Sequence, residues 1–196
     1  IAPAGVINYL NTDAAGSRLQ ERRVSLAPWV NEKTRLVSPD RYLSKSEKFR
    51  MGDIDFTITA LGSAHSEGDL TLFVDTDRVL FSGDVIFDGR VPWLGDADTV
   101  NWLDTLKQIR DAKPAAIVPG HGELSSDPDA LIKLTLNYLE FVRAKMKEAV
   151  DNWVTFDDAY DEVDWGEYEY LPAFFEANRR NAYQVYLSLE QESLKK

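Results

Sequence analysis

Two histidines and one aspartate are the residues whose types and positions could do metal chemistry in this chain. His65 and His121 are its two histidines, each beside small or turn-forming residues, and Asp84 follows a Ser-Gly pair. Each comes after a short apolar run that we expect to be a strand. Imidazole and carboxylate are ordinary zinc ligands. Taken singly, each is more often a plain turn residue, but three at strand ends favour a metal site along one edge of a sheet.

The elements that must position these residues show two periodicities. Residues 49–60 alternate apolar and polar side chains about a Gly-Asp turn, and residues 70–81 do so about Thr-Asp, which predicts two β-hairpins. Residues 115–118 form a short apolar run that leads into Pro-Gly-His121-Gly. Helical spacing predicts four helices, over residues 13–29, 98–113, 127–152 and 178–192. Strands followed by alternating helix, strand and helix predict an α/β or α+β fold.

Composition excludes several classes of function. The chain has 196 residues and a net charge of −11, which disfavours coating of nucleic acid or of an anionic membrane. It contains no cysteine, so disulfides, zinc knuckles and thiol nucleophiles are excluded. No apolar run reaches the roughly 20 residues of a membrane span. We therefore expect a soluble chain, of cytoplasm or periplasm, that acts on a small molecule.

Three segments in register resemble the metal-binding motifs of the metallo-β-lactamase-fold hydrolases. They are Leu61-Gly-Ser-Ala-His65-Ser-Glu-Gly-Asp-Leu, Val79-Leu-Phe-Ser-Gly-Asp84-Val-Ile-Phe and Ile117-Val-Pro-Gly-His121-Gly, with the two intervals being 19 and 37 residues. The stretch from residue 89 to 98 is also similar to glyoxalase II-like and quinoprotein-relay members of that superfamily. The resemblance covers about residues 49–152.

The resemblance implies a two-zinc site and its chemistry. In such hydrolases His65 would be a ligand of the first zinc, Asp84 would bridge the two zincs as the catalytic carboxylate, and His121 would complete the second. A metal-bound hydroxide would attack an ester or thioester, because zinc lowers the pKa of its water and polarises a carbonyl. Arg90, Trp93 and Asp96 follow the bridging position and would line the substrate cleft, although a salt-bridged loop is an equal alternative.

One departure from the family pattern limits this interpretation. The family's His-x-His-x-Asp-His motif should precede the helix near residue 13, and the sequence does not contain it. The motif supplies two ligands to each zinc, so each site retains fewer than the three protein ligands of a catalytic zinc. We therefore expect weak or no zinc binding by this chain, and no catalysis by the chain alone.

Two explanations of the missing motif stay open. The chain could be the C-terminal portion of a zinc hydrolase, starting inside a larger polypeptide, or a non-catalytic binding module derived from that fold. The first is preferred here because the three retained motifs are well formed. The fold expected is an incomplete αββα sandwich, with residues 1–152 in the lactamase-like domain and residues 153–196 as an acidic, aromatic helical extension packed on it. A sheet without its partner would expose apolar surface and favour self-association.

Overall fold

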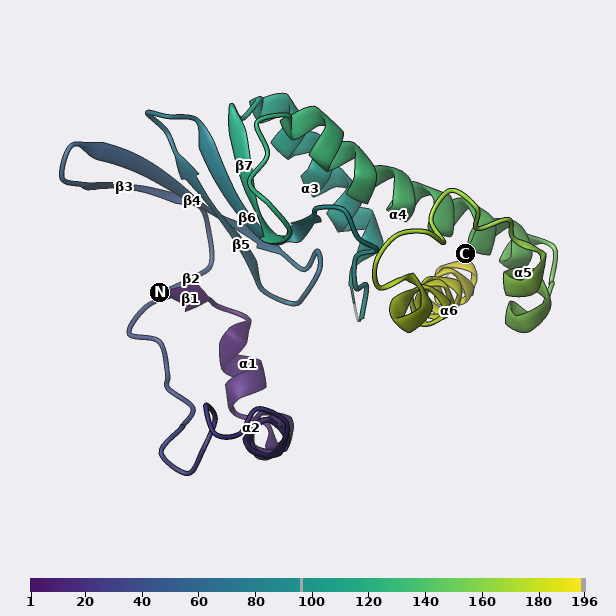
Figure 1. The fold of residues 1–196 in the computed structure, drawn as a ribbon, viewed down its shortest axis with the longest axis horizontal. Helices are drawn as coiled ribbons and strands as arrows, with labels where there is room; N and C mark the ends of the chain where they lie inside the picture. The colour runs from purple at the N-terminus through teal and green to yellow at the C-terminus, as the bar shows by residue number, and fades with distance from the viewer. Residues whose placement is uncertain (96, 195–196) are drawn as a thin grey trace.

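The main feature of the chain is a mixed five-stranded sheet with helices packed against it, in a computed structural model that describes residues 1–95 and 97–194 (Figure 1). Its strands, in order across the sheet, are β3 (Glu47–Met51), β4 (Ile54–Gly62), β5 (Asp69–Val74), β6 (Val79–Phe87) and β7 (Ala116–His121). The first four run antiparallel, whereas β7 is parallel to β6 and is reached through helix α3 (Thr99–Ala112). A parallel pair needs such a crossover. The expected α/β class is confirmed.

The two predicted hairpins are confirmed. Strand β3 pairs with β4 from Met51 opposite Ile54, so the turn holds two residues, and Gly52 takes a φ of +61° there. This left-handed conformation suits glycine, which lacks a Cβ. Strand β5 pairs with β6 from Val74 opposite Val79. The alternation of side chains therefore gave both the strands and their turns.

The predicted starts are confirmed for three helices, the first of which begins at Asp13 as expected, and wrong for the last. Asp98 caps α3 by accepting hydrogen bonds from the backbone of the first turn, and Asp127 caps α4 (Pro128–Asp151) in the same way. Helix α6 (Phe174–Ser193) begins at Phe174 and not at 178, because Phe174 and Ala177 are buried. Its cap residue, Ala173, has no capping side chain, so the sequence carries no start signal there.

The sheet has one face covered by helices. On that face Leu80 of β6 lies opposite Ile117 of β7, and their exposed fractions are 5% and 0%. Helices α3 and α4 contact these strands and close a core around Trp102, which is fully buried. The predicted helix-over-sheet layer therefore forms around the strands that carry the site.

The opposite face of the sheet is apolar and open. Phe49 stacks on Phe56 across β3 and β4 at 5.2 Å between ring centroids. Met51, Ile54 and Phe81 lie on the same face and are 67%, 40% and 43% exposed. An apolar sheet face of this kind is the surface that the αββα sandwich would bury against a second sheet. Self-association through it stays a prediction.

The N-terminal part forms a small unit of its own, apart from the C-terminal helices in Figure 1. Its strands β1 (Ala2–Pro3) and β2 (Tyr42–Leu43) pair in parallel, and helices α1 (Val6–Leu10) and α2 (Asp13–Ser25) lie between them in the chain. Helix α2 ends before the predicted residue 29. These strands and α1 are too short to give a periodic signal, and the sequence did not predict them.

The C-terminal helices are joined to α4 by buried polar contacts. Asn181 of α6 accepts a hydrogen bond from the Leu94 amide at 3.0 Å and donates to the carbonyl of Pro92 and the hydroxyl of Tyr138 at 2.7 and 2.9 Å. Helix α5 (Phe156–Glu162) packs beside them, and Trp165 joins the same core. Residues between 153 and 194 thus contribute to the core. No helix in the described part of the chain is both long and apolar enough to cross a membrane.

Candidate metal centre

His65 lies in the loop that joins β4 to β5, and the Asp69 carboxylate holds this loop in place. One oxygen of Asp69 accepts hydrogen bonds from the backbone amides of Ala64 and Ser66 at 3.1 and 2.9 Å. Its other oxygen accepts from the Ser66 hydroxyl at 2.7 Å. A carboxylate that accepts several donors within one turn fixes the backbone on both sides of His65.

Asn101 of α3 anchors the start of the same loop. Its amide nitrogen donates hydrogen bonds to the carbonyls of Leu61 and Ser63 at 3.0 and 2.6 Å. Between them Gly62 has a φ of +72°, where the register of β4 against β5 shifts. The loop therefore leaves the sheet at a defined angle, which directs His65 towards β6 and β7.

Asp84 lies within β6, and the prediction that it follows the end of a strand is wrong. Pairing of β6 with β5 ends at Phe81, but β6 continues beside β7 as far as Phe87. Gly83, with a φ of +54°, marks a register shift in this stretch. A bulge of this kind redirects the side chain that follows it, so Asp84 turns out of the regular alternation.

His121 is the last residue of β7, so the strand runs further than the predicted 115–118. Its carbonyl accepts a hydrogen bond from the Asp88 amide at 3.0 Å. Gly120 and Gly122 flank it at close approaches of the backbone. An added Cβ would lie 2.0 Å from an Asp84 oxygen at Gly120 and 2.3 Å from the Asp88 Cβ at Gly122. Only glycine fits between the strands at these positions.

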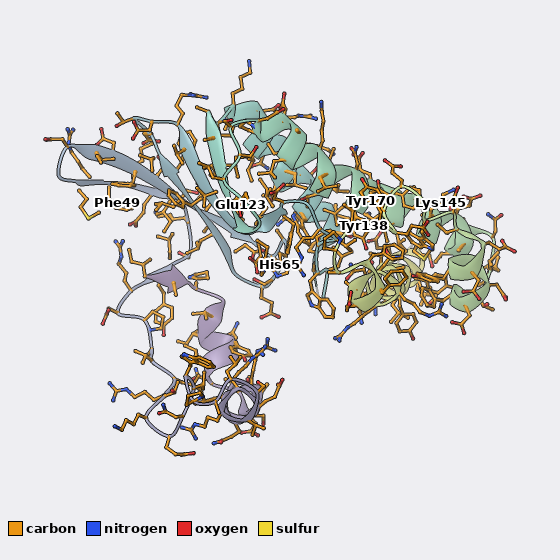
Figure 2. All side chains as sticks on the ribbon, in the orientation of Figure 1. Phe49, His65, Glu123, Tyr138, Lys145 and Tyr170 are labelled. Carbon is orange, nitrogen blue, oxygen red and sulfur yellow. The ribbon has the colours of Figure 1, made fainter. Side chains whose placement is uncertain are left out.

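The side chains of His65, Asp84 and His121 lie close together. The Nε2 atom of His65 lies 3.7 Å from Oδ2 of Asp84, and the Nε2 atom of His121 lies 3.7 Å from Oδ1. Both separations exceed a hydrogen bond. The carboxylate thus presents one oxygen to each imidazole. The His65 side chain is 17% exposed, whereas those of Asp84 and His121 are nearly half exposed, and Figure 2 places His65 at one end of the sheet.

Two aromatic side chains support the imidazoles from behind. Phe87 packs against both histidines, with ring centroids 5.8 Å from His65 and 5.4 Å from His121. Trp102 meets His65 edge-on at 5.4 Å, and its indole N–H donates to the Val85 carbonyl at 2.8 Å. The sequence gave no sign of these roles. From the sequence, Phe87 is an ordinary strand residue and Trp102 an ordinary core residue of a helix. Their contacts with the histidines arise only in the folded chain.

The donors fit a metal in type but fall short in number. The Nδ1 atom of His65 is buried without a hydrogen-bond partner, and neither imidazole nitrogen of this residue has one among the described residues. Such an unsatisfied ring is unusual in a protein interior and suits a residue whose ligand is a cation. However, in the part of the chain that the structure describes, no three His, Asp or Glu side chains are arranged so that they could hold one metal ion together. Two donors per metal are one fewer than a catalytic zinc requires.

The residues predicted to line a substrate cleft have different outcomes. Trp93 is 38% exposed and lies at a groove that also reaches His65, with the Arg180 guanidinium 4.7 Å from its ring. This is a cation–π contact. The Nε atom of Arg90 is buried and has no hydrogen-bond partner among the residues that the structure describes, and Arg90 is not part of that groove's lining. Asp96 lies outside the described residues.

The groove beside His65 has a volume of about 780 Å³. One wall is the loop of His65, from residue 65 to 68, together with Trp93 and Gly95. The other wall comes from the N-terminal unit, and its residues are Pro3, Gly5, Val6, Asn8, Tyr9, Thr12 and Ala14. This wall was not predicted, since none of the candidate site residues lies within the first 14 positions.

The mixed sheet thus has helices on one face and carries a carboxylate between two imidazoles. The family model described as "Metallo-beta-lactamase superfamily" matches residues 13–121, more than half of the chain. The chain belongs to the metallo-β-lactamase superfamily.

Two relatives are similar to this chain at low sequence identity and over only part of their length. A type 2 metallo-beta-lactamase of Bacteroides fragilis is 25% identical over 124 residues, which are 61% of this chain and 48% of that protein. An acyl-coenzyme A thioesterase MBLAC2 of Gallus gallus is 27% identical over 108 residues, which are 53% of this chain and 38% of that protein. The chain therefore spans less than half the length of these relatives.

Solved structures show the same partial coverage. A metallo-beta-lactamase from Pontibacter korlensis is similar over 53% of this chain and 50% of its own, with a TM-score of 0.48 and 23% identity. The metallo-beta-lactamase IND-7 is similar over 53% of this chain and 49% of its own, with a TM-score of 0.46 and 20% identity.

Proposed function

We propose that this chain carries one half of the metal centre of a zinc hydrolase, with His65, Asp84 and His121 as its ligands. The observation that carries the proposal is the Asp84 carboxylate, whose two oxygens each face a different imidazole at 3.7 Å. A carboxylate in this position suits two cations that share it. Zinc bound there would act as a Lewis acid towards a carbonyl and lower the pKa of its water.

The substrate class proposed is a small ester or thioester. The MBLAC2 relative is named as an acyl-coenzyme A thioesterase, and the Bacteroides fragilis relative as a β-lactamase. The family resemblance of the segment from 89 to 98, which includes Trp93, supports the thioesterase direction. The absence of cysteine argues against the lactamases that use a cysteine ligand at the bridging position.

As part of this proposal, the chain alone would not catalyse hydrolysis. Its described residues give each cation two donors, so the coordination that would orient a nucleophile and a substrate is incomplete. The alternative is a binding module that uses the fold without chemistry. The groove beside His65 favours it, because a cavity of about 780 Å³ has the size of a small-molecule site.

Metal titration of the purified chain tests the ligand assignment. Calorimetry with Zn²⁺, and the visible absorption of bound Co²⁺, should show weak binding that Asp84→Asn reduces at least about tenfold. The control is Asp104→Asn, which removes an exposed carboxylate of α3 that lies outside the site and should leave binding unchanged. Equal affinity in Asp84→Asn and wild type would overturn the assignment.

A hydrolysis assay tests the second part of the proposal. The zinc-loaded chain is incubated with thioester, lactam and phosphodiester substrates, and no turnover above that of free zinc is expected. Turnover that Asp84→Asn abolishes would show that the chain is a complete enzyme, which contradicts the proposal. Retention of a thioester in equilibrium dialysis, without turnover, would favour the binding module.

A further inference from the structure

The wall of the groove that faces His65 includes residues from the end of helix α1 and the start of helix α2. This is the place in the chain where the family's His-x-His-x-Asp-His motif should lie. Six consecutive residues there, Tyr9-Leu10-Asn11-Thr12-Asp13-Ala14, keep the aspartate of the motif at its fifth position. The three positions that would hold histidine are Tyr9, Asn11 and Ala14.

The fold brings this segment to the correct side of the site. Residues 9 and 10 end α1, and residues 13 and 14 begin α2. Strand β1, which pairs in parallel with β2, comes before α1, so the segment lies one short helix beyond the carboxyl end of a parallel strand. The N-terminal unit also touches the loop of His65 directly. An added Cβ at Gly5 would lie 2.8 Å from the Glu67 carbonyl oxygen, and one at Gly68 would lie 2.9 Å from Pro3. Tyr9, Thr12 and Ala14 line the same groove as His65.

The side chains of this segment offer a cation almost nothing. The Thr12 hydroxyl donates to the Tyr9 carbonyl at 2.7 Å, so it serves the turn between α1 and α2. Alanine has no donor atom, and neutral phenol and amide groups are poor ligands for zinc beside imidazole and carboxylate. Asp13 retains a carboxylate at the first position of α2.

We infer that residues 9–14 stand in the place of the ligand motif, and that three side chains within this chain, Tyr9, Asn11 and Ala14, keep its metal centre incomplete. This inference rests on the proposed function, because it takes His65, Asp84 and His121 as the other ligands. It assigns the segment a definite role: it closes the groove over the site and leaves room there for an organic ligand where a fuller ligand set would hold metal.

The test is to give the segment its three imidazoles. The variant Tyr9→His/Asn11→His/Ala14→His should bind Zn²⁺ at least about tenfold more tightly than wild type, and should take up two equivalents of Co²⁺ where wild type takes at most one. The intense visible bands of tetrahedral Co²⁺ report the binding independently of any activity. The three positions are accessible, since Tyr9 is 41% exposed and the other two are exposed as well.

A matched control separates placement from the number of histidines. The variant Arg18→His/Glu32→His/Lys45→His adds three imidazoles at exposed positions that do not line the groove, and should bind metal as wild type does. Equal metal affinity and stoichiometry in the two triple variants would overturn the inference. If circular dichroism shows that the first variant does not fold, Asn11→His/Ala14→His serves the same comparison with Tyr9 intact.

The outcomes also distinguish this inference from the proposed function. If Asp84→Asn binds metal as tightly as wild type, the ligand assignment itself fails. If Asp84→Asn loses binding but the triple histidine variant gains none, the assignment stands and the placement of residues 9–14 is wrong. Adding Asp84→Asn to the triple histidine variant should reverse at least part of its gain.

Discussion

Gly120 lies where β7 passes the bulge of β6, and alanine at this position tests how the site is packed. An added Cβ would lie 2.0 Å from Oδ1 of Asp84, 2.6 Å from the carbonyl carbon of Gly83 and 2.8 Å from the Asp84 amide nitrogen. The carboxylate can rotate away, but the other two atoms belong to the backbone. Because carbon atoms pack at about 3.5–4.0 Å, the two strands would have to separate locally by roughly 1 Å.

The expected cost follows from this overlap. Insertion of a methyl group into a packed site typically destabilises a protein by about 1–3 kcal/mol. This corresponds to a factor of roughly 5 to 160 in the ratio of folded to unfolded molecules. Rotation of the Asp84 carboxylate away from Gly120 would also move Oδ1 from its place opposite His121. Gly120→Ala should therefore lower both the free energy of unfolding and the affinity for Zn²⁺.

Urea unfolding followed by tryptophan fluorescence measures the first effect, and Zn²⁺ calorimetry the second. With a slope of about 1–3 kcal/mol per molar urea, the midpoint should fall by the order of 1 M. Gly16→Ala is the matched control, since no atom lies within 4 Å of an added Cβ there and the residue is inside α2. It should stabilise the chain by up to about 1 kcal/mol. A Gly120→Ala chain with wild-type stability and metal affinity would refute the close approach of the strands.

Three further predictions concern the support of the site and the core. Phe87→Leu should keep most of the core volume, cost about 1 kcal/mol and weaken Zn²⁺ binding, because the ring contacts both His65 and His121; unchanged calorimetric affinity would contradict this role. Asp69→Ala removes the acceptor of three hydrogen bonds in the His65 loop, and hydrogen exchange should show faster opening of that loop, with β7 unaffected. Burial raises the pKa of Tyr168 to about 12 from its ordinary 10.0. The folded state then holds this proton more tightly than the unfolded state, so its contribution is present below pH 10 and is lost as the pH rises towards 12. Tyr168→Phe should reduce the fall in stability over that interval, as measured by urea unfolding at several pH values; an unchanged fall would assign it to other groups.

The elements that are marked by local sequence signals could be predicted from the sequence. Alternation placed both hairpins, and the capping chemistry of Asp98 and Asp127 placed two helix starts, because these signals act over a few residues. The start of α6 was missed because Phe174 is helical through burial against distant residues, a tertiary effect with no local sign. The two-residue strands β1 and β2 depend in the same way on each other, across nearly 40 intervening residues.

In the candidate site, too, the residues could be predicted from local signals, whereas their geometry could not. His65, Asp84 and His121 could be picked out because turn-forming neighbours and a family resemblance mark them in the sequence. Their mutual distances could not, since these depend on the bulge at Gly83 and on the parallel register of β6 and β7. Phe87 was missed for the same reason: its contact with both imidazoles arises only once the strands are paired.

The parallel pairing of β6 with β7 has a consequence for how the sheet comes apart. Asp84 and His121 lie on these two neighbouring strands, so a cation bound by both would cross-link the strands. By linkage, ligand at 100 times its dissociation constant opposes any opening that releases it by about 2.7 kcal/mol. The coupling is reciprocal, because separation of the two strands would release the cation. Metal binding and local opening of the β6–β7 pair would then be coupled, so that a measurement of either one would report on the other.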